Sequence, residues 1–416
     1  MRALVIAIVI ATAGPVFAQQ TASDLPPGWV MPSGLVAEPA LLRKAANASD
    51  GIVKGDAGGR DGLYPDFGHM ITGAGWISAG PGYRHHVADG RVLVDVSAAL
   101  SWRLYKVAQA RFELPRLAHE RLVLGAQGLY QDLVQVNYFG MGAESRAPDR
   151  SGYRFSSVDL FGYATARATD HLSVSARAGW IRQPSLSTMT GRRAKFPNTI
   201  ELFSDSSAPG LLVQPSFLHG DAAIAGDWRD HAGHPTRGGL YRAAAASYSD
   251  RDTGIYSFQR YEIEASQFVP FFGSKLVMAI HGWEVFTDAS SGGIVPFYLL
   301  PSLGGGNTLR GYYNFRFHDR QMQSFNVESR VALFTHLDAA VFADAGKVAH
   351  RARDLDFTHL KTACGFGVRV HNATSTLARV DIGYGAEGWR TSFTMTDSFT
   401  RSTPYAGGST VVPFVP

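Results

Sequence analysis

Apolar and polar residues alternate one by one through many segments of this chain. In one segment Cys364, Phe366 and Val368 share one parity, whereas Gly365 and Arg369 share the other. A period of two is typical of a β-strand whose two faces meet different surroundings. After the N-terminal region, no run approaches the roughly 18 consecutive apolar residues of a membrane helix. The pattern therefore predicts an all-β fold.

Counting back from Phe399, sixteen such segments can be traced within residues 66–399. They are 91–102, 103–114, 121–139, 153–168, 171–184, 217–229, 237–249, 256–269, 274–287, 319–334, 338–349, 359–371, 375–386 and 389–399, with two less sharply bounded strands between Asp66 and Val87. Bacterial outer-membrane barrels have an even number of antiparallel strands, with short turns on one side and long loops on the other. Tight turns at 335–338 and 372–375 and long loops at 183–216 and 288–318 follow this rule.

A soluble β-sandwich is the alternative, because its strands alternate too. In a sandwich the apolar face is the core, and charges such as Arg260, Glu262 and Glu264 point to water. Three features favour a membrane barrel instead. They are the even strand number, the long loops on one side and the aromatic residues near strand ends, such as Trp180 and Trp389. We therefore expect a 16-stranded antiparallel transmembrane β-barrel of the outer membrane.

The first residues have the composition of an export signal. Arg2 precedes an apolar run from Ala3 to Ala13, and Val16-Phe17-Ala18 forms a small-residue cleavage site. We expect residues 1–18 to be a signal peptide, and residues 19–65 to be a short periplasmic segment with a helix around Leu41 to Ala46. One cysteine in the chain excludes a disulfide framework and a cysteine-ligated metal site.

Charge gives little support for a nucleic-acid partner. The 39 basic and 35 acidic residues leave a formal charge of +4, and the basic residues are scattered instead of forming a stripe. We expect outer-membrane lipid to be the surrounding partner and no nucleic acid to bind.

The loop at 288–318 contains the most informative motif. Its central residues are Gly304, Gly305, Leu309, Arg310, Gly311 and Tyr312. A glycine-rich stretch can cradle phosphate, but no Lys-Ser/Thr pair follows and no helix supplies a dipole. Arg310 between apolar neighbours is better explained as a forked donor that seeks carboxylates in a confined space.

The next two strands offer those carboxylates. Parity places Glu328 on the interior face of 319–334, and it places Asp344 with Phe342 and Gly346 on one face of 338–349. A loop folded inward, with Arg310 paired to both acids, would obstruct the barrel, and pairing makes a buried arginine tolerable. In the alternative, Arg310 lies on a solvated loop and both acids line water.

Catalytic and metal-binding constellations are not recognisable. The 14 histidines are scattered, and neither His85 with His86 nor His231 with His234 has a third ligand at a useful spacing. There is no Gly-x-Ser-x-Gly elbow and no convincing Ser/His pair. We expect no catalytic residues, no metal and no cofactor.

Four short motifs resemble those of the BamA/TamA-like bacterial surface antigen superfamily. They are Leu309-Arg310-Gly311-Tyr312, Phe342-Ala343-Asp344-Ala345-Gly346, Phe139-Gly140-Met141-Gly142 and Asp227-Trp228-Arg229-Asp230. The resemblance spans roughly Tyr138 to Phe399 and implies a sixteen-stranded outer-membrane barrel that inserts or secretes proteins. It makes Arg310 the family's loop arginine and makes Glu328 and Asp344 its partners on the barrel wall. It also makes the segment with Phe393, Met395 and Phe399 similar to a terminal assembly signal.

Two departures from the family pattern shape the functional expectation. Residues 19–65 leave no room for a polypeptide-transport-associated (POTRA) domain, and 17 residues, 400–416, follow Phe399. The resemblance thus implies a POTRA-less, stand-alone member that inserts, translocates or rearranges envelope proteins or lipids, with a client outer-membrane or secreted protein as a partner. A passive pore or a surface-exposed structural antigen is the alternative, and the oligomeric state is not predicted.

Overall fold

The computed structural model describes residues 33–40, 42–44, 61–67, 78–190, 195–289 and 292–399. The expected signal peptide, most of the segment 19–65 and the extension 400–416 lie outside the described residues. A helical turn covers residues 42–44, within the short helix expected there. In the part of the chain that is described, no helix is both long and apolar enough to cross a membrane.

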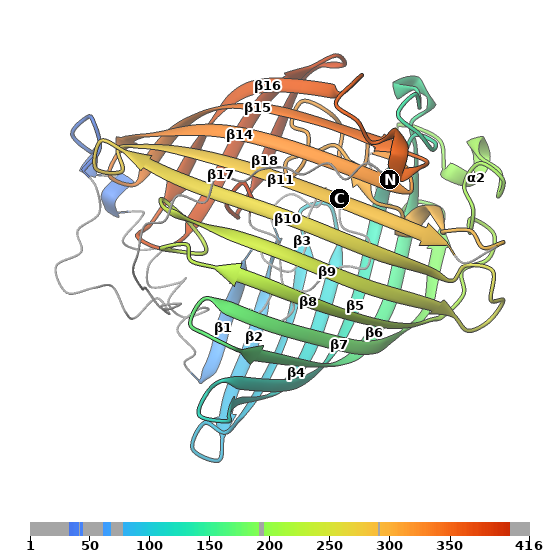
Figure 1. The fold of residues 1–416 in the computed structure, drawn as a ribbon, viewed down its shortest axis with the longest axis horizontal. Helices are drawn as coiled ribbons and strands as arrows, with labels where there is room; N and C mark the ends of the chain where they lie inside the picture. The colour runs from blue at the N-terminus through green and yellow to red at the C-terminus, as the bar shows by residue number, and fades with distance from the viewer. Residues whose placement is uncertain are drawn as a thin grey trace.

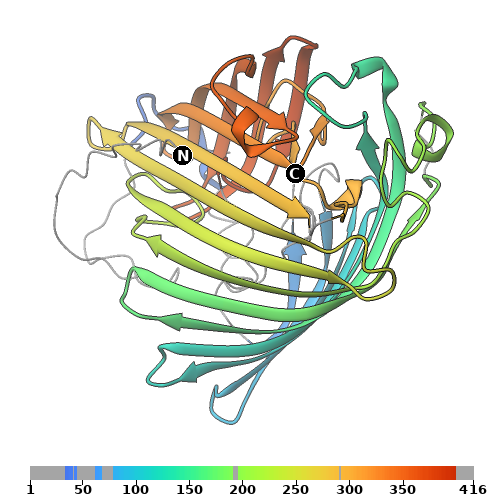
Figure 2. The same ribbon diagram turned by 45° about the vertical axis from the view of Figure 1, so that its right-hand side comes forward.

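One antiparallel sheet of 16 strands, hydrogen-bonded in chain order, makes up most of the described chain (Figure 1). Its strands are β1 (Gly62–Phe67), β2 (Ser78–Val87), β3 (Val92–Ser101), β4 (Lys106–Leu117), β5 (Leu122–Tyr138), β6 (Ser151–Arg167), β7 (Leu172–Ser187), β8 (Phe217–Asp227), β9 (Gly238–Asp250), β10 (Phe258–Phe271), β11 (Leu276–Ala289), β14 (Gln321–Phe334), β15 (Leu337–Ala349), β16 (Lys361–His371), β17 (Thr376–Gly385) and β18 (Gly388–Thr394). Figures 1 and 2 show the sheet curving around an interior to form a barrel. The expected all-β, sixteen-stranded fold is confirmed.

The two ends of the sheet differ from the expected bounds. β1 begins at Gly62, four residues before the expected start of the barrel at residue 66. β18 ends at Thr394, although the alternation predicted a strand as far as Phe399. The prediction was wrong there because Asp397, Ser398 and Phe399 leave the sheet and are buried, at 1%, 3% and 5% exposure. The other expected strands agree with the structure to within three residues at each end.

The two faces of the sheet separate the barrel from the sandwich. On β16 the apolar side chains of Phe366 and Val368 are 51% and 40% exposed, whereas Arg369 is fully buried. Val327 and Glu328 on β14 show the same contrast, at 41% and 0%. A soluble sandwich would bury the apolar residues and expose the charges. An apolar outside and a polar inside are what a membrane barrel requires.

The connections distinguish the two rims of the barrel. The loop between β7 and β8 (188–216) and the loop between β11 and β14 (290–320) are long and lie on one rim. The connections β14–β15 (335–336) and β16–β17 (372–375) are short and lie on the other, which we call the short-turn rim. In bacterial barrels the short turns face the periplasm. The loop 290–320 also contains the small sheet of β12 (Ser302–Leu303) and β13 (Phe317–His318).

Candidate functional site

The first part of the loop 290–320 packs into the barrel interior as an apolar bend, which we define as Val295–Leu300. Its apolar residues Val295 and Phe297–Leu300 are 0–3% exposed. Phe297–Leu299 form a single 3₁₀ turn. The Phe297 ring lies 4.6 Å from the Tyr138 ring and 5.0 Å from the Tyr153 ring, centroid to centroid. Arg260 on β10 donates a hydrogen bond to the Leu299 carbonyl. The bend is thus held by aromatic side chains of the wall formed by β5 to β10.

The next part, Gly304–Tyr312, is a tight turn that we call the arginine turn. The Gly305 amide donates to the Leu309 carbonyl at 3.2 Å, and the Gly304 amide donates to the Thr308 hydroxyl at 2.9 Å. Gly305 has φ +97°, a conformation that side-chain-bearing residues rarely adopt. The turn brings Leu309 into the core at 0% exposure and presents Arg310 to the wall.

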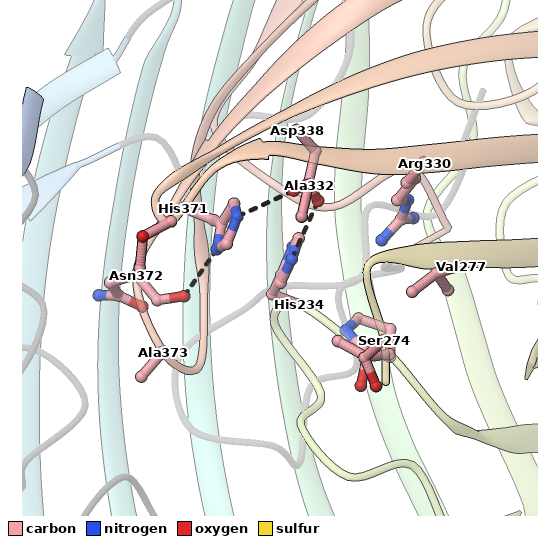
Figure 3. Close-up of a pocket in the computed structure, with 12 residues that line it drawn as sticks. His234, Ser274, Val277, Arg330, Ala332, Asp338, His371, Asn372 and Ala373 are labelled. Carbon is pink, nitrogen blue, oxygen red and sulfur yellow. Dashed lines mark hydrogen bonds and ion pairs between the residues drawn. The ribbon is translucent and has the colours of Figure 1, made fainter. Parts of the chain in front are cut away.

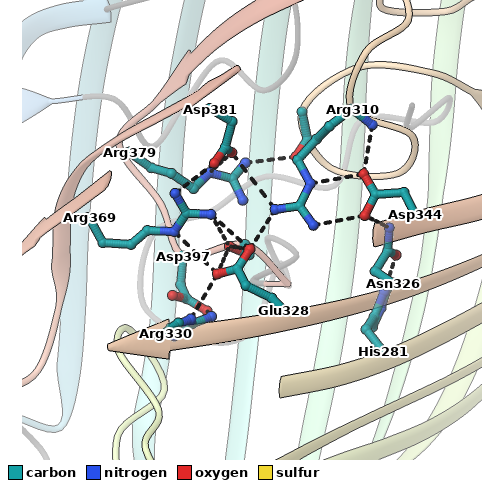
Figure 4. Close-up of polar contacts among 12 residues, drawn as sticks. His281, Arg310, Asn326, Glu328, Arg330, Asp344, Arg369, Arg379, Asp381 and Asp397 are labelled. Atoms are coloured by element: carbon teal, nitrogen blue, oxygen red, sulfur yellow. Dashed lines mark hydrogen bonds and ion pairs between the residues drawn. The ribbon is translucent and has the colours of Figure 1, made fainter. Parts of the chain in front are cut away.

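Arg310 meets both carboxylates that parity had placed on the interior face (Figure 4). Its Nε and Nη2 donate to the two oxygens of Asp344 at 2.9 and 2.7 Å, and its own backbone amide donates to Asp344 at 2.9 Å. Nη1 donates to Glu328 Oε2. The guanidinium carbon lies 3.5 Å from the centroid of the Phe342 ring. A forked, stacked contact of this kind fixes both the position and the plane of the guanidinium.

The charge of Arg310 is matched to its surroundings. Burial by itself lowers the pKa of Arg310, but the carboxylates of Asp344 and Glu328 outweigh burial and hold this pKa above its usual value. Although Arg310 is only 3% exposed, these carboxylates keep it a cation inside the barrel. Its neutralisation depends on the wall and not on water.

Arg310 belongs to a larger set of buried charges, which we call the arginine cluster. The cluster contains Arg310, Arg330, Arg369, Arg379, Glu328, Asp344, Asp381 and Asp397, each at most 3% exposed. Besides Arg310, Glu328 binds Arg369 Nη2 at 2.7 Å and Arg330 Nε at 2.9 Å. Asp381 binds Arg369 Nη1 at 2.6 Å, and Asp397 binds Arg330 Nη2 at 3.0 Å. Four cations face four anions, and this balance makes burial of so many charges tolerable.

Two glycines of the wall allow the loop 290–320 to approach closely. A Cβ on Gly383 of β17 would lie 2.6 Å from the Gly311 amide nitrogen, closer than real Cβ contacts allow. A Cβ on Gly346 of β15 would lie 2.8 Å from the Leu303 side chain. The Tyr312 hydroxyl, at the end of the turn, donates to the Thr362 carbonyl at 3.3 Å and accepts from the Ala386 amide at 3.2 Å.

The returning part of the loop is also attached to the barrel. The Gly142 amide donates to the His318 carbonyl at 2.7 Å, and Arg316 pairs with Glu387 at 2.6 Å. The Arg316 guanidinium also lies 4.8 Å from the Phe139 ring centroid. The motif Phe139–Gly142 therefore contacts the same loop as the arginine motif, although the two are more than 150 residues apart in the chain.

The three residues expected in an assembly signal do not share one surface. Phe393 lies opposite Val380 on β18 and β17, and Met395 follows the end of β18. The Phe399 ring stacks on His281 inside the barrel, with centroids 4.9 Å apart and planes at 11°.

Sequence reasoning missed most of the arginine cluster. Arg369, Arg379 and Asp381 occupy interior parity on β16 and β17, and that parity was the signal that could have found them. Asp397 had no such signal, because in the expected strand 389–399 it shares the parity of the apolar residues Phe393, Met395 and Phe399. It reaches Arg330 only because the chain turns inward after Thr394.

Most of the barrel is similar to known proteins. Residues 103–396 match the model of the Omp85 superfamily domain. BamA from Haemophilus ducreyi lacking POTRA domains 1–3 is similar, with a TM-score of 0.60 and 15% identity over 80% of this chain and 70% of that chain. CdiB from Escherichia coli has a TM-score of 0.51 and 10% identity over 80% of this chain and 61% of that chain. No curated protein matches.

Proposed function

Because this chain belongs to the Omp85 superfamily of outer-membrane barrels, we propose that it inserts, translocates or rearranges envelope proteins or lipids and catalyses no chemical reaction. In this proposal an export signal at residues 1–18 directs the chain to the envelope. The client is an outer-membrane or secreted protein whose strand pairs with the open ends of the sheet.

The observation that carries this proposal is the seam between the two ends of the sheet. β1 and β18 are the ends of the strand order, and no hydrogen-bonded ladder joins them among the residues that the structure describes. They have six and seven residues, whereas β5 has 17. Unpaired strand edges accept an additional strand through their free backbone groups. Two short ends therefore favour a seam at which a client strand can pair.

The loop connects the barrel interior to this seam. Arg379 on β17 donates to the Gly306 carbonyl of the arginine turn at 2.8 Å and to the Thr394 hydroxyl at the end of β18 at 2.9 Å. A change in the position of the turn is thereby transmitted to the last strand of the sheet. We propose that Arg310, Glu328 and Asp344 form a lock that keeps the loop inside and the seam closed in the resting protein.

The same contacts argue against a passive pore. The apolar bend and the arginine turn both occupy the interior, and each is held by buried contacts with the wall. In planar bilayers we expect a mostly closed barrel with rare openings. A steady, large conductance would instead favour the passive pore.

Assisted folding in proteoliposomes tests the seam directly. Urea-denatured outer-membrane barrel protein is added to vesicles with and without this chain, and its folding is followed by gel mobility without heating. Cysteine pairs are scanned along Gly62–Phe67 and Gly388–Thr394 in a Cys364→Ala background. We expect a disulfide across the seam to abolish assistance and a reductant to restore it.

A matched control places the disulfide inside the sheet. Tyr83→Cys with Val96→Cys joins residues that lie directly opposite each other on β2 and β3. We expect this pair to leave assistance unchanged. The proposal fails if the uncrosslinked chain does not accelerate client folding, or if seam and control disulfides have the same effect.

A further inference from the structure

A second buried group of polar side chains lies at the short-turn rim, apart from the arginine turn (Figure 3). It consists of His234 in the connection between β8 and β9, Asp338 at the start of β15 and His371 at the end of β16. His234 Nε2 is 3.3 Å from Asp338 Oδ2, and His371 Nε2 is 3.2 Å from Asp338 Oδ1. All three residues are 5–6% exposed. One ligand atom from each lies within 4.8 Å of the others.

An unusually long turn delivers His234 to this place. The connection 228–237 has ten residues and is the longest of the described connections on the short-turn rim. Its Gly233 carbonyl accepts a hydrogen bond of 2.9 Å from the Thr376 amide, and Gly233 forms a parallel bridge with Ser375. The sequence pairs His234 with His231 but offers no third ligand at a useful spacing, and we therefore expected no metal. The fold instead brings His234 to two residues more than 100 positions away.

The partners of the two Nδ1 atoms fix where the imidazole protons are. His371 Nδ1 is 3.0 Å from the Asn372 carbonyl, which can only accept, so this nitrogen carries the hydrogen. His234 Nδ1 is 3.1 Å from the Thr376 hydroxyl, whose hydrogen points to Asp397 Oδ1 at 3.3 Å. The hydroxyl oxygen therefore accepts from His234. These tautomers are assigned from the hydrogen-bond partners.

This assignment leaves three acceptors pointing at one another. In the neutral rings both Nε2 atoms carry lone pairs, and both face the Asp338 carboxylate. The rings are stacked with centroids 3.9 Å apart and planes at 11°, so two protonated rings would repel each other at close range. A single proton satisfies only one of the two contacts. One divalent cation between the three groups satisfies both at once.

We propose that His234, Asp338 and His371 bind a divalent transition-metal ion of the zinc type. Two neutral imidazole nitrogens and a carboxylate are a ligand set that zinc uses, and nitrogens that donate from Nδ1 to a carbonyl or hydroxyl are the usual orientation of such ligands. The nitrogen–oxygen distances of 3.2 and 3.3 Å are close to the separation of two ligand atoms each about 2.0–2.1 Å from a tetrahedral ion. Because the two rings are nearly parallel, they must tilt for both Nε2 lone pairs to reach the same ion. The ion fastens the turn 228–237 to β15 and β16.

The surroundings accommodate such an ion. A cavity of about 30 Å³ adjoins the three residues, enough for a water molecule as a fourth ligand. Arg330 also lines this cavity. Its charge is engaged by Glu328 at 2.9 Å and by Asp397 at 3.0 Å, so it does not leave an unbalanced cation next to the metal.

Metal titration of the purified full-length chain tests the site. The protein is prepared in detergent without a histidine tag, stripped with a chelator, and titrated with Zn²⁺ alone and with Co²⁺ alone. We expect one equivalent of either ion to bind, visible absorption bands of tetrahedral Co²⁺, and a thermal midpoint that rises with free Zn²⁺. Folding of every sample is checked by the change in gel mobility on heating.

Matched variants identify the ligands. We expect His234→Ala, Asp338→Asn and His371→Gln each to weaken Zn²⁺ binding at least about 100-fold, and Thr376→Val to weaken it about 10- to 100-fold through loss of orientation. His231→Ala, in the same turn, should bind as the unchanged chain does. If the folded chain binds no Zn²⁺, or if the folded ligand variants bind it as tightly as His231→Ala, the metal site is refuted.

Discussion

The apolar bend and the arginine turn belong to one loop, yet different forces hold them. The bend is buried among aromatic side chains of β5 to β10, whereas the turn is held by charge pairs with β14, β15 and β17. Hydrophobic contact is non-directional and tolerates small shifts. A forked ion pair fixes both the position and the orientation of a guanidinium, because two parallel hydrogen bonds must form together. The bend therefore stabilises the loop, and the turn fixes its position.

The two anchors also connect opposite parts of the barrel. The bend contacts strands far from the seam, and the turn contacts the strands that lead to β18. Loss of either anchor therefore has a different consequence.

Glu328→Ala should have the largest effect. It removes the carboxylate that pairs with Arg310, Arg330 and Arg369, and it leaves the arginine cluster with an excess of buried positive charge. We expect a loss of about 3–5 kcal/mol in the free energy of unfolding. Urea unfolding in detergent, followed by gel mobility, measures it.

Glu262→Ala is the matched control for that variant. Glu262 is also on the interior face, but its side chain is 16% exposed, against 0% for Glu328, and it pairs with Arg242 at 3.3 Å. We expect a loss below about 1 kcal/mol. Equal losses for both variants would contradict the special role of Glu328.

Phe297→Ala should destabilise the barrel by about 3–4 kcal/mol because it empties a fully buried aromatic site in the bend. Phe272→Ala, at a position that is 79% exposed, should change little. Unfolding of the double variant Phe297→Ala/Arg310→Lys tests whether the two anchors are independent. Independent anchors give additive losses, whereas a strong coupling energy would show that bend and turn act as one unit.

Arg310→Lys should cost about 1–2 kcal/mol, because lysine keeps the charge but cannot form the forked contact with Asp344. We expect faster trypsin cleavage within the loop of the folded protein. Arg146→Lys, whose side chain is 73% exposed, serves as the reference. Unchanged cleavage in Arg310→Lys would remove the positional role of the fork.

Gly383→Ala should have the most local effect, about 1 kcal/mol on global stability, because its Cβ would push the backbone of Arg310 and Gly311 away from the wall. The amides of residues 310–312 should exchange faster with solvent, as hydrogen-exchange mass spectrometry measures. Gly162→Ala is the control, since its Cβ would have no atom closer than 3.7 Å. Slow exchange at 310–312 in both variants would show that the turn does not depend on this close approach.

Local alternation predicted the strands well because a period of two is a property of neighbouring residues. The same parity assigned Glu328 and Asp344 to the interior, where both lie in the structure. Parity alone could not show that Phe399 turns inward onto His281. That position depends on a contact between the segment after β18 and the distant strand β11. Likewise His234 reaches Thr376 across 142 residues, and no local pattern contains that distance.

Cys364, the one thiol of the chain, lies exposed on the outer face of β16. The neighbouring Ala363 points inward, and its Cβ would lie 3.1 Å from a Cβ on Gly311. One strand thus presents the loop tip on its inside and a single reactive group on its outside. A spectroscopic label on Cys364 would sense motion of this wall from the lipid side, in the unaltered sequence and without touching the lumen.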